Sequence, residues 1–333
     1  MRRTRGWLKR FLASKQLEAR ERVEIGNVLN GIGDDRSGVG VDKDTKLPAM
    51  AWVPIPGNPA LKLGDGLRGE PDPEFAEQNE RWESKATLTV EAFYLSSYPV
   101  TVAQYRAFVE DGGYEQRSWW TQAGWSEVRE KQKRSVPEDW DEQARLANHP
   151  VTGVSWHEAV AYSRWLTARL RESGQLKEGW IIRLPMEAEW EWAARGPKGT
   201  RWPWGDEWPK DAAYCNNRDA DIGRTSAVGL FPWVSDWLVG KESELPSIPL
   251  QTDRLHDQSG NVWEWCATKW QGEYPLPNPN EWSDTYLSGD ARRVLRGGSW
   301  GYGARVVRAA CRSRDVPGIR FGILGFRCAR VHS

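Results

Sequence analysis

The sequence has few of the residues that most often build metal centres and nucleophilic sites. Its 333 residues include four cysteines and four histidines, and no two cysteines stand in a CxxC spacing. No histidine lies beside a pair of cysteines, which excludes the common zinc-ligand patterns and argues against a disulfide framework. The histidines are scattered, and the sequence shows no Ser-His-Asp or paired-carboxylate arrangement.

Long apolar runs and an excess of one charge are also missing. The chain has 46 basic and 46 acidic residues, so no field of one sign marks a nucleic-acid-binding protein. No stretch approaches the roughly 20 apolar residues of a membrane span. The basic N-terminus lacks the apolar core of a signal peptide. We therefore expect no nucleic-acid partner, no membrane span and a cytoplasmic location with reduced thiols.

Tryptophan is the abundant residue, with 22 copies. Its large apolar ring and single polar N–H suit both loop-rich cores and binding faces, and core packing is the commoner use. The chain is long enough for one large domain or two ordinary ones.

The N-terminal region differs in character from the rest of the chain. Apolar residues spread among Lys, Arg and Glu predict one amphipathic helix over residues 7–30. The Gly- and Asp-rich stretch that follows, over 31–48, is typical of a linker. We expect residues 1–46 to form a helix and linker, which either docks a partner or frays in solvent, and residues 47–333 to form the main domain.

Helix signals are confined to the first part of that domain. Thr101 with Gln104, and Ser155 with Glu158, have the spacing of capping boxes. A third short helix is expected just before Gly196. Beyond it, Pro, Gly, Trp, Asn and Asp dominate between short strand-like runs, which predicts a loop-rich half held by a small antiparallel sheet. The fold class is therefore α+β.

Several motifs occur in an order that is typical of one family. They are YPVTVAQYRAFV, HPVTGVSWHEAVAYSRWL, RLPMEAEWEWAARG, PWGDEW, IGRTSAVGLFP, SGNVWEWC, RVLRGGSW and GFRCAR. Together they resemble the formylglycine-generating enzyme (sulfatase-modifying factor) superfamily, from about residue 50 to the C-terminus. The resemblance implies a C-type lectin-type fold with few helices, small antiparallel sheets and long ordered loops.

The resemblance also allows the known chemistry of the family to be checked. Its active oxidases use copper and a pair of cysteines placed three and eight residues after the Ser of the RGGS motif. That serine is Ser299 here, and the two positions hold Tyr302 and Val307. Neither can supply the soft thiolate that Cu(I) requires. A second branch uses three His ligands to iron from an N-terminal bundle, but the first histidine of this chain is His149. We therefore expect no copper and no enzymatic activity.

The C-terminal segment, about residues 293–333, resembles another group with the same frame. These are the variable proteins of diversity-generating retroelements, which display hypervariable residues on a C-type lectin scaffold and bind a protein or other macromolecular ligand. In that frame Trp300, Arg308, Arg312, Arg314, Arg320 and Arg327 would be fixed. The ligand-binding positions implied by the resemblance are Gly301, Tyr302, Gly303, Val306, Cys311, Ser313, Asp315, Val316, Gly318, Ile319, Phe321, Gly322, Ile323 and Leu324.

Composition supports this resemblance. Such segments vary by mutation at adenines of AAC codons, which cannot yield Glu, Lys, Gln, Met or Trp. None of these five types occurs over residues 301–324. The alternatives are a catalytically inactive or structural member of the superfamily and, less favoured, a copper-dependent formylglycine-generating oxidase. For Ile323 and Leu324, a place in the last core strand stays open.

One further motif suggests a cation site. In HDQSGNVWEW, Asp257 and Glu264 could supply carboxylates, and Gly260 and Val262 could supply carbonyls, which are the hard oxygen ligands that calcium prefers. The matching positions bind calcium in the oxidases of the superfamily. The alternative is that Glu264 only accepts hydrogen bonds. A second calcium site of the family would fall near Tyr214, which stands where an Asn ligand is expected.

Overall fold

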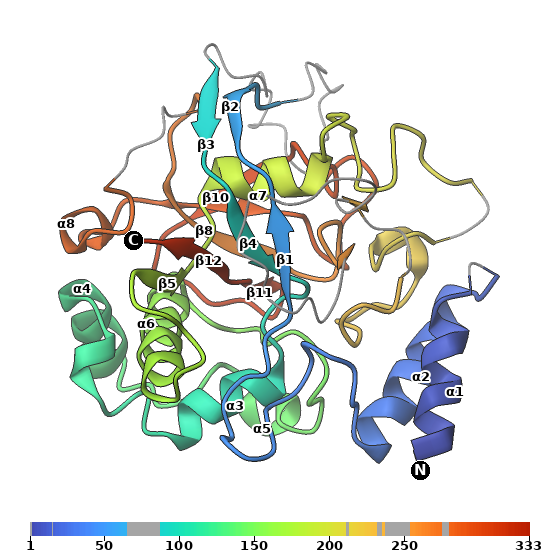
Figure 1. The fold of residues 1–333 in the computed structure, drawn as a ribbon, viewed down its shortest axis with the longest axis horizontal. Coiled ribbons are helices and arrows are strands. Elements are labelled where there is room, and N and C mark those ends of the chain that lie inside the picture. The colour runs from blue at the N-terminus through green and yellow to red at the C-terminus, as the bar shows by residue number, and fades with distance from the viewer. Residues whose placement is uncertain are drawn as a thin grey trace.

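The computed structural model describes residues 2–14, 16–64, 87–210, 213–231, 235–236, 254–274 and 280–333. Short strands and loops lie in the middle of the molecule, and helices lie around them (Figure 1). The α+β class with small sheets and long ordered loops is confirmed.

The helices are α1 (Arg2–Leu12), α2 (Ala19–Ile32), α3 (Val102–Glu110), η2 (Arg117–Trp119), α4 (Gln122–Gly124), η3 (Trp125–Lys131), α5 (Trp140–Gln143), α6 (Trp156–Glu172), α7 (Glu187–Arg195), η4 (Arg218–Ala220) and α8 (Asp284–Leu287). The strands are β1 (Trp52–Ile55), β2 (Asn58–Leu61), β3 (Leu88–Val90), β4 (Phe93–Ser96), β5 (Trp180–Arg183), β6 (Ser235–Asp236), β7 (Arg254–Leu255), β8 (Trp263–Lys269), β9 (Arg293–Arg296), β10 (Arg312–Asp315), β11 (Leu324–Gly325) and β12 (Ala329–His332).

Two four-stranded sheets organise the main domain. The first has the order β1-β4-β12-β5, so the C-terminal strand lies between strands from much earlier in the chain. The second has the order β10-β9-β8-β11 and carries the C-terminal segment. Its β8–β11 pair is parallel, whereas β8–β9 and β9–β10 are antiparallel as predicted.

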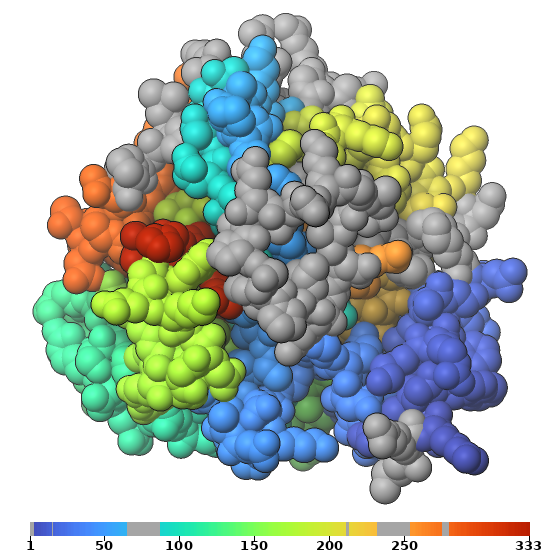
Figure 2. Space-filling view, in the orientation of Figure 1, coloured from blue at the N-terminus to red at the C-terminus, as the bar shows by residue number. Residues whose placement is uncertain are grey.

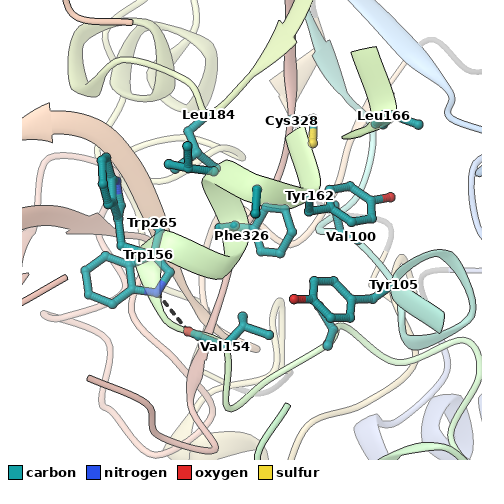
Figure 3. Packing of buried hydrophobic residues seen from close by; sticks show 14 of the residues in the cluster. Val100, Tyr105, Val154, Trp156, Tyr162, Leu166, Leu184, Trp265, Phe326 and Cys328 are labelled. Atoms are coloured by element: carbon teal, nitrogen blue, oxygen red, sulfur yellow. Dashed lines mark hydrogen bonds between the residues drawn. The ribbon is translucent and has the colours of Figure 1, made fainter. Parts of the chain in front are cut away.

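The largest hydrophobic core is rich in aromatic rings, as the tryptophan and tyrosine content suggests. The rings of Tyr105 and Tyr162 stack with centroids 5.4 Å apart, and Phe326 meets Tyr162 edge-on at 5.3 Å (Figure 3). Trp265 donates its indole N–H to the carbonyl of Val154 at 3.1 Å. Buried indoles thus obtain the polar partner that their N–H requires.

The two helix starts predicted from capping boxes are confirmed. The hydroxyl of Thr101 accepts from the backbone N–H of Gln104, and the Gln104 side chain accepts from the Thr101 N–H. Ser155 and Glu158 make the same reciprocal pair at the start of α6. These boxes satisfy donors that a helix start would leave unpaired.

The expected single helix over residues 7–30 is wrong. The structure has two helices, α1 and α2, which lie side by side at one edge of the molecule (Figure 1). The break has a physical cause in Arg22, a buried residue of α2. Its guanidinium donates to the carbonyl of Leu12 at 2.9 Å and to that of Ser14 at 2.5 Å, so it caps the end of α1.

The two helices pack against the main domain. Leu12, Ala19 and Leu29 share a buried cluster with Ala227 and Leu230. The expected linker is also anchored. Arg36 pairs with Asp34 and donates to the carbonyl of Val228 at 2.8 Å, while Gln104 donates to that of Gly38 at 2.9 Å. In the described part of the chain, no helix has the length and apolar character needed to cross a membrane.

Candidate ligand-binding surface

The C-terminal segment begins at a tight turn that only glycine fits. Gly297 and Gly298 both have positive φ, at 94° and 70°. A Cβ on Gly298 would lie 2.8 Å from Val307 Cγ1 and 3.0 Å from the carbonyl oxygen of Val306. The Gly-Gly pair therefore lets the chain leave β9 and fold back against itself.

Two arginines of the segment are held by glutamates from distant helices. Arg312 donates through Nε and Nη2 to the carboxylate of Glu187 at 2.6 and 2.9 Å. Arg320 donates through Nε to Glu158 Oε2 at 2.9 Å, and its Nη2 contacts the other oxygen. Both glutamates are buried. Bidentate pairs of this kind fix orientation as well as position.

A third arginine is held in the same way. Arg327 donates to both oxygens of Glu264, at 2.6 and 2.8 Å, and both side chains are fully buried. Trp190 adds its indole N–H to Glu264 Oε2 at 2.6 Å. The segment is thus tied to β8, which carries Glu264 and pairs with β11.

The backbone between these arginines is anchored as well. The carbonyls of Pro317, Phe321 and Ile323 accept from backbone N–H groups outside the segment, at 3.4, 3.1 and 2.8 Å. Such bonds do not depend on side-chain identity. Backbone and arginine contacts therefore hold the loop path, and the exposed side chains of Val316 and Phe321 lie outside this framework.

Eleven of the fourteen positions implied by the resemblance reach solvent, three of them as exposed residues and eight as half-buried ones. Val316 and Phe321 are 43% and 47% exposed, and Gly322 is exposed. The half-buried positions are Gly301, Tyr302, Gly303, Ser313, Asp315, Gly318, Ile319 and Ile323. A Cβ added at Gly301 or Gly322 would meet nothing within 4 Å, whereas one at Gly303 or Gly318 would lie 2.9 Å from Arg218 or 3.3 Å from Glu127.

Three of the expected surface residues are not on the surface. Val306, Cys311 and Leu324 are 4%, 7% and 2% exposed and belong to the main hydrophobic core. Leu324 lies in β11, where pairing with β8 turns its side chain inward. It therefore belongs to a core strand, which is the alternative that the sequence had left open for this residue. These three side chains cannot contact a ligand without unfolding the core.

Tyr302 and Val307, which stand where the oxidases of the family have cysteines, pack against neighbouring side chains. The ring of Tyr302 meets that of Trp263 edge-on at 5.8 Å. Val307 is buried beside Trp202 and Cys215. Burial raises the pKa of the Cys215 thiol well above its usual range and that of Cys328 to about 12. Copper(I) requires thiolates, so the residues present do not fit a copper site of that kind.

The expected calcium ligands are also engaged elsewhere. Both oxygens of Glu264 face the Arg327 guanidinium, and Asp257 Oδ2 accepts from the N–H of Gly229 at 2.7 Å. The carbonyl oxygen of Gly260 accepts from the N–H of Val262 at 2.9 Å. A cationic guanidinium at the central carboxylate opposes a second cation. The donor set therefore does not fit calcium, and Glu264 acts here as a hydrogen-bond acceptor.

Sequence reasoning missed the glutamates that hold the segment. Glu158 appeared only as a capping-box residue and Glu187 was not singled out, yet each is the partner of an arginine of the segment. Glu158 also accepts from the hydroxyl of Tyr114 at 2.5 Å. The sequence did carry a signal for these glutamates. The resemblance implies fixed arginines in the segment, and an arginine that is buried needs an acidic partner.

Curated relatives of the chain are named as enzymes. The hercynine oxygenase of Mycolicibacterium thermoresistibile is 33% identical over 80% of this chain and 56% of its own length. The formylglycine-generating enzyme of Streptomyces coelicolor is 34% identical over 55% of this chain and 52% of its own. The chain spans between 53% and 64% of the length of the three hercynine oxygenases that it matches.

These relatives overturn the expectation that the chain is not an enzyme. That expectation rested on the replacement of the cysteine pair by Tyr302 and Val307. Hercynine oxygenases at 29–33% identity show that enzymatic activity in such relatives goes beyond formylglycine generation. The missing cysteines therefore argue against copper-dependent formylglycine generation but not against catalysis in general.

Solved structures agree on the fold. Treponema denticola variable protein 1 superposes with a TM-score of 0.53 at 21% identity, covering 84% of this chain and 94% of that one. PvdO from Pseudomonas aeruginosa gives a TM-score of 0.57 at 21% identity, covering 90% and 99%. The family described as the sulfatase-modifying factor enzyme 1-like domain matches residues 40–332. The chain belongs to this family, and the resemblance drawn from its motifs is confirmed.

Proposed function

We propose that the chain binds a protein ligand through its C-terminal segment. The binding surface, called the variable face below, consists of the predicted positions that reach solvent. They are Gly301, Tyr302, Gly303, Ser313, Asp315, Val316, Gly318, Ile319, Phe321, Gly322 and Ile323.

The observation that carries this proposal is the separation of framework from surface. Arg312, Arg320 and Arg327 are held by glutamates outside the segment, whereas the side chains of Val316 and Phe321 between them are exposed to solvent. A surface that accepts many sequences must not carry the core, and this arrangement meets that requirement. An ordinary core loop would instead bury its apolar residues.

The chemistry of the variable face suits a protein partner. Val316 and Phe321 are large apolar side chains at high exposure, and Ile319 and Ile323 are partly exposed beside the core. Exposed large apolar side chains are available to an interface, and an aromatic ring such as that of Tyr302 is a common anchor there. A folded protein with a matching apolar patch would bury these groups.

The same segment supports an origin in a diversity-generating retroelement. Residues 301–324 lack the five residue types that adenine mutagenesis of AAC codons cannot produce. The fold is also shared with a protein named as variable. Sequencing the DNA beside the gene tests this origin. A near-copy of the segment that differs at adenines, next to a reverse-transcriptase gene, is expected, and its absence would refute the origin while leaving ligand binding open.

A display library tests ligand binding directly. Codons for Val316, Ile319, Phe321 and Ile323 are randomised, and a control library randomises the same number of buried positions, including Val306 and Leu324. The first library should stay folded and yield binders to a defined soluble protein such as lysozyme. The proposal fails if the two libraries lose folded members equally.

The relatives favour oxygenase activity as a second candidate. The chain is 33% identical to a hercynine oxygenase over 80% of its own length, although it covers 56% of that protein. Incubation with hercynine, a thiol and iron(II) in air, followed by mass spectrometry, tests this function. Consumption of hercynine would support it, and an unchanged substrate pool would leave the binding function as the better account.

A further inference from the structure

Helix α1 presents two different faces. Leu8 and Leu12 point toward the cluster shared with residues 220–231. The exposed residues recur with helical spacing on the other side: Arg3, Thr4, Trp7, Arg10 and Phe11. This set, together with Gly6, is called the outer face of α1 below.

Two large aromatic rings on the outer face are open to solvent. Trp7 is 57% exposed and Phe11 is 38% exposed, whereas Trp156, Trp165 and Trp190 are fully buried. The rings of Trp7 and Phe11 lie edge-to-face with centroids 4.4 Å apart. The two rings pack against each other and do not cover the core, so their exposed apolar area is available for a binding partner.

Positive charge accompanies these rings. The helix contains Lys and Arg side chains and no Asp or Glu. Arg5 and Lys9 face inward and share Asp35, at 3.5 and 3.1 Å. Arg3 and Arg10 are exposed and have no ion pair within the described ranges. The outer face therefore keeps two uncompensated guanidinium groups, one at each side of Trp7.

Gly6 leaves a shallow hollow between these guanidinium groups. The hollow is lined by Arg3, Thr4, Gly6, Trp7 and Arg10. A Cβ at Gly6 would meet nothing within 4 Å, so no neighbour requires a glycine there. Glycine inside a helix costs about 1 kcal/mol relative to alanine. The hollow instead gives an anionic group room to approach both arginines at the level of the indole.

We propose that the outer face of α1 lies on the surface of an anionic lipid bilayer. Aromatic rings between arginines on one side of a helix suit the boundary between headgroups and acyl chains, where Trp is favoured and phosphates attract Arg. The helices α1 and α2 form an outer corner of the molecule, which a flat surface can reach (Figure 2). The helix lies on the bilayer and does not cross it, since its 11 residues are too short.

Vesicle sedimentation with the full chain tests the proposal. The probes are vesicles of phosphatidylcholine alone and vesicles that also contain phosphatidylglycerol, at roughly three to one. Binding to the anionic vesicles alone is expected, with release at high salt because exposed charges are screened. The paired variants Trp7→Ala/Phe11→Ala and Arg3→Glu/Arg10→Glu should each bind at least about tenfold more weakly.

Matched controls distinguish vesicle binding through the outer face of α1 from non-specific adsorption. Phe321→Ala removes an aromatic ring of similar exposure on the variable face, and Lys198→Glu reverses an exposed charge elsewhere. Both should bind vesicles like the unmodified chain. Equal binding to neutral vesicles, or unchanged binding by the two paired variants, would overturn the proposal. So would sedimentation equilibrium that shows dimers dissolved by Trp7→Ala/Phe11→Ala without any vesicle binding.

Discussion

Arg312 and Glu187 join the start of β10 to the first turn of α7 through two parallel hydrogen bonds, at 2.6 and 2.9 Å. Both residues are buried, and the guanidinium of Arg312 also lies over the rings of Trp270 and Tyr274, at 4.4 and 4.2 Å. The helix N-terminus favours the Glu187 carboxylate further. One arginine thus fixes the path of the variable face from a helix more than a hundred residues away in the sequence.

Removing this arginine should destabilise the fold strongly. Arg312→Met leaves the buried Glu187 carboxylate without its bidentate partner, which typically costs about 3–5 kcal/mol. Urea denaturation measures the loss. The control is Arg20→Met, because the Arg20–Asp221 pair is exposed on both sides and should be worth less than about 1 kcal/mol. Equal losses in the two variants would mean that the buried pair does not hold the segment.

Leu324 and Phe321 should respond in opposite ways to the same substitution. Leu324→Ala opens a cavity in the core and should cost about 2–5 kcal/mol. Phe321→Ala removes an exposed ring and should change the free energy of unfolding by about 0.5 kcal/mol or less. Thermal denaturation compares them. A large loss for Phe321→Ala would show that its ring carries the fold, which would remove it from the variable face.

The Gly-Gly turn should tolerate no side chain. Gly298→Ala forces a Cβ at positive φ to within 3.0 Å of the Val306 carbonyl oxygen, so we expect a loss above about 1 kcal/mol. Gly322→Ala is the matched control, because its φ is not in the left-handed region and nothing lies within 4 Å of the added methyl group. That variant should keep its midpoint in guanidinium chloride. Loss of stability at Gly322 and not at Gly298 would contradict the turn geometry.

Two buried histidines should make the protein sensitive to mild acid. Burial lowers the pKa of His149 and of His157 from 6.5 to about 4 in the folded chain. Between these values the unfolded chain binds more protons than the folded one. The free energy of unfolding therefore falls as the pH drops from about 6.5 to about 4, by on the order of 3 kcal/mol for each of these two histidines.

Urea denaturation between pH 7.5 and 4.5 measures this effect. His157→Gln should show a shallower decline than the unmodified chain, whereas His332→Gln, at an exposed position, should follow the unmodified curve. An unchanged slope in His157→Gln would show that this imidazole is protonated equally in both states.

Local features were predictable from the sequence because their causes lie within a few residues. The capping boxes at Thr101 and Ser155 depend on side chains three positions apart. The Gly-Gly turn depends on backbone freedom at one point. The motif order identified the family from about residue 50 to the C-terminus, and the family match covers residues 40–332. The break between α1 and α2 could not be seen in the same way, because Arg22 becomes a cap for Leu12 only when the two helices fold together.

The sequence by itself determined the α+β class, the family, the helix starts at Thr101 and Ser155 and the Gly-Gly turn, all of which follow from local motifs. The tertiary structure decided which residues of the C-terminal segment face solvent, because Leu324 and Phe321 look alike in sequence and differ only in what packs on them. It also decided the partners of Arg312, Arg320 and Arg327. Those pairs join positions 125, 162 and 63 residues apart, a separation that only the folded chain can close.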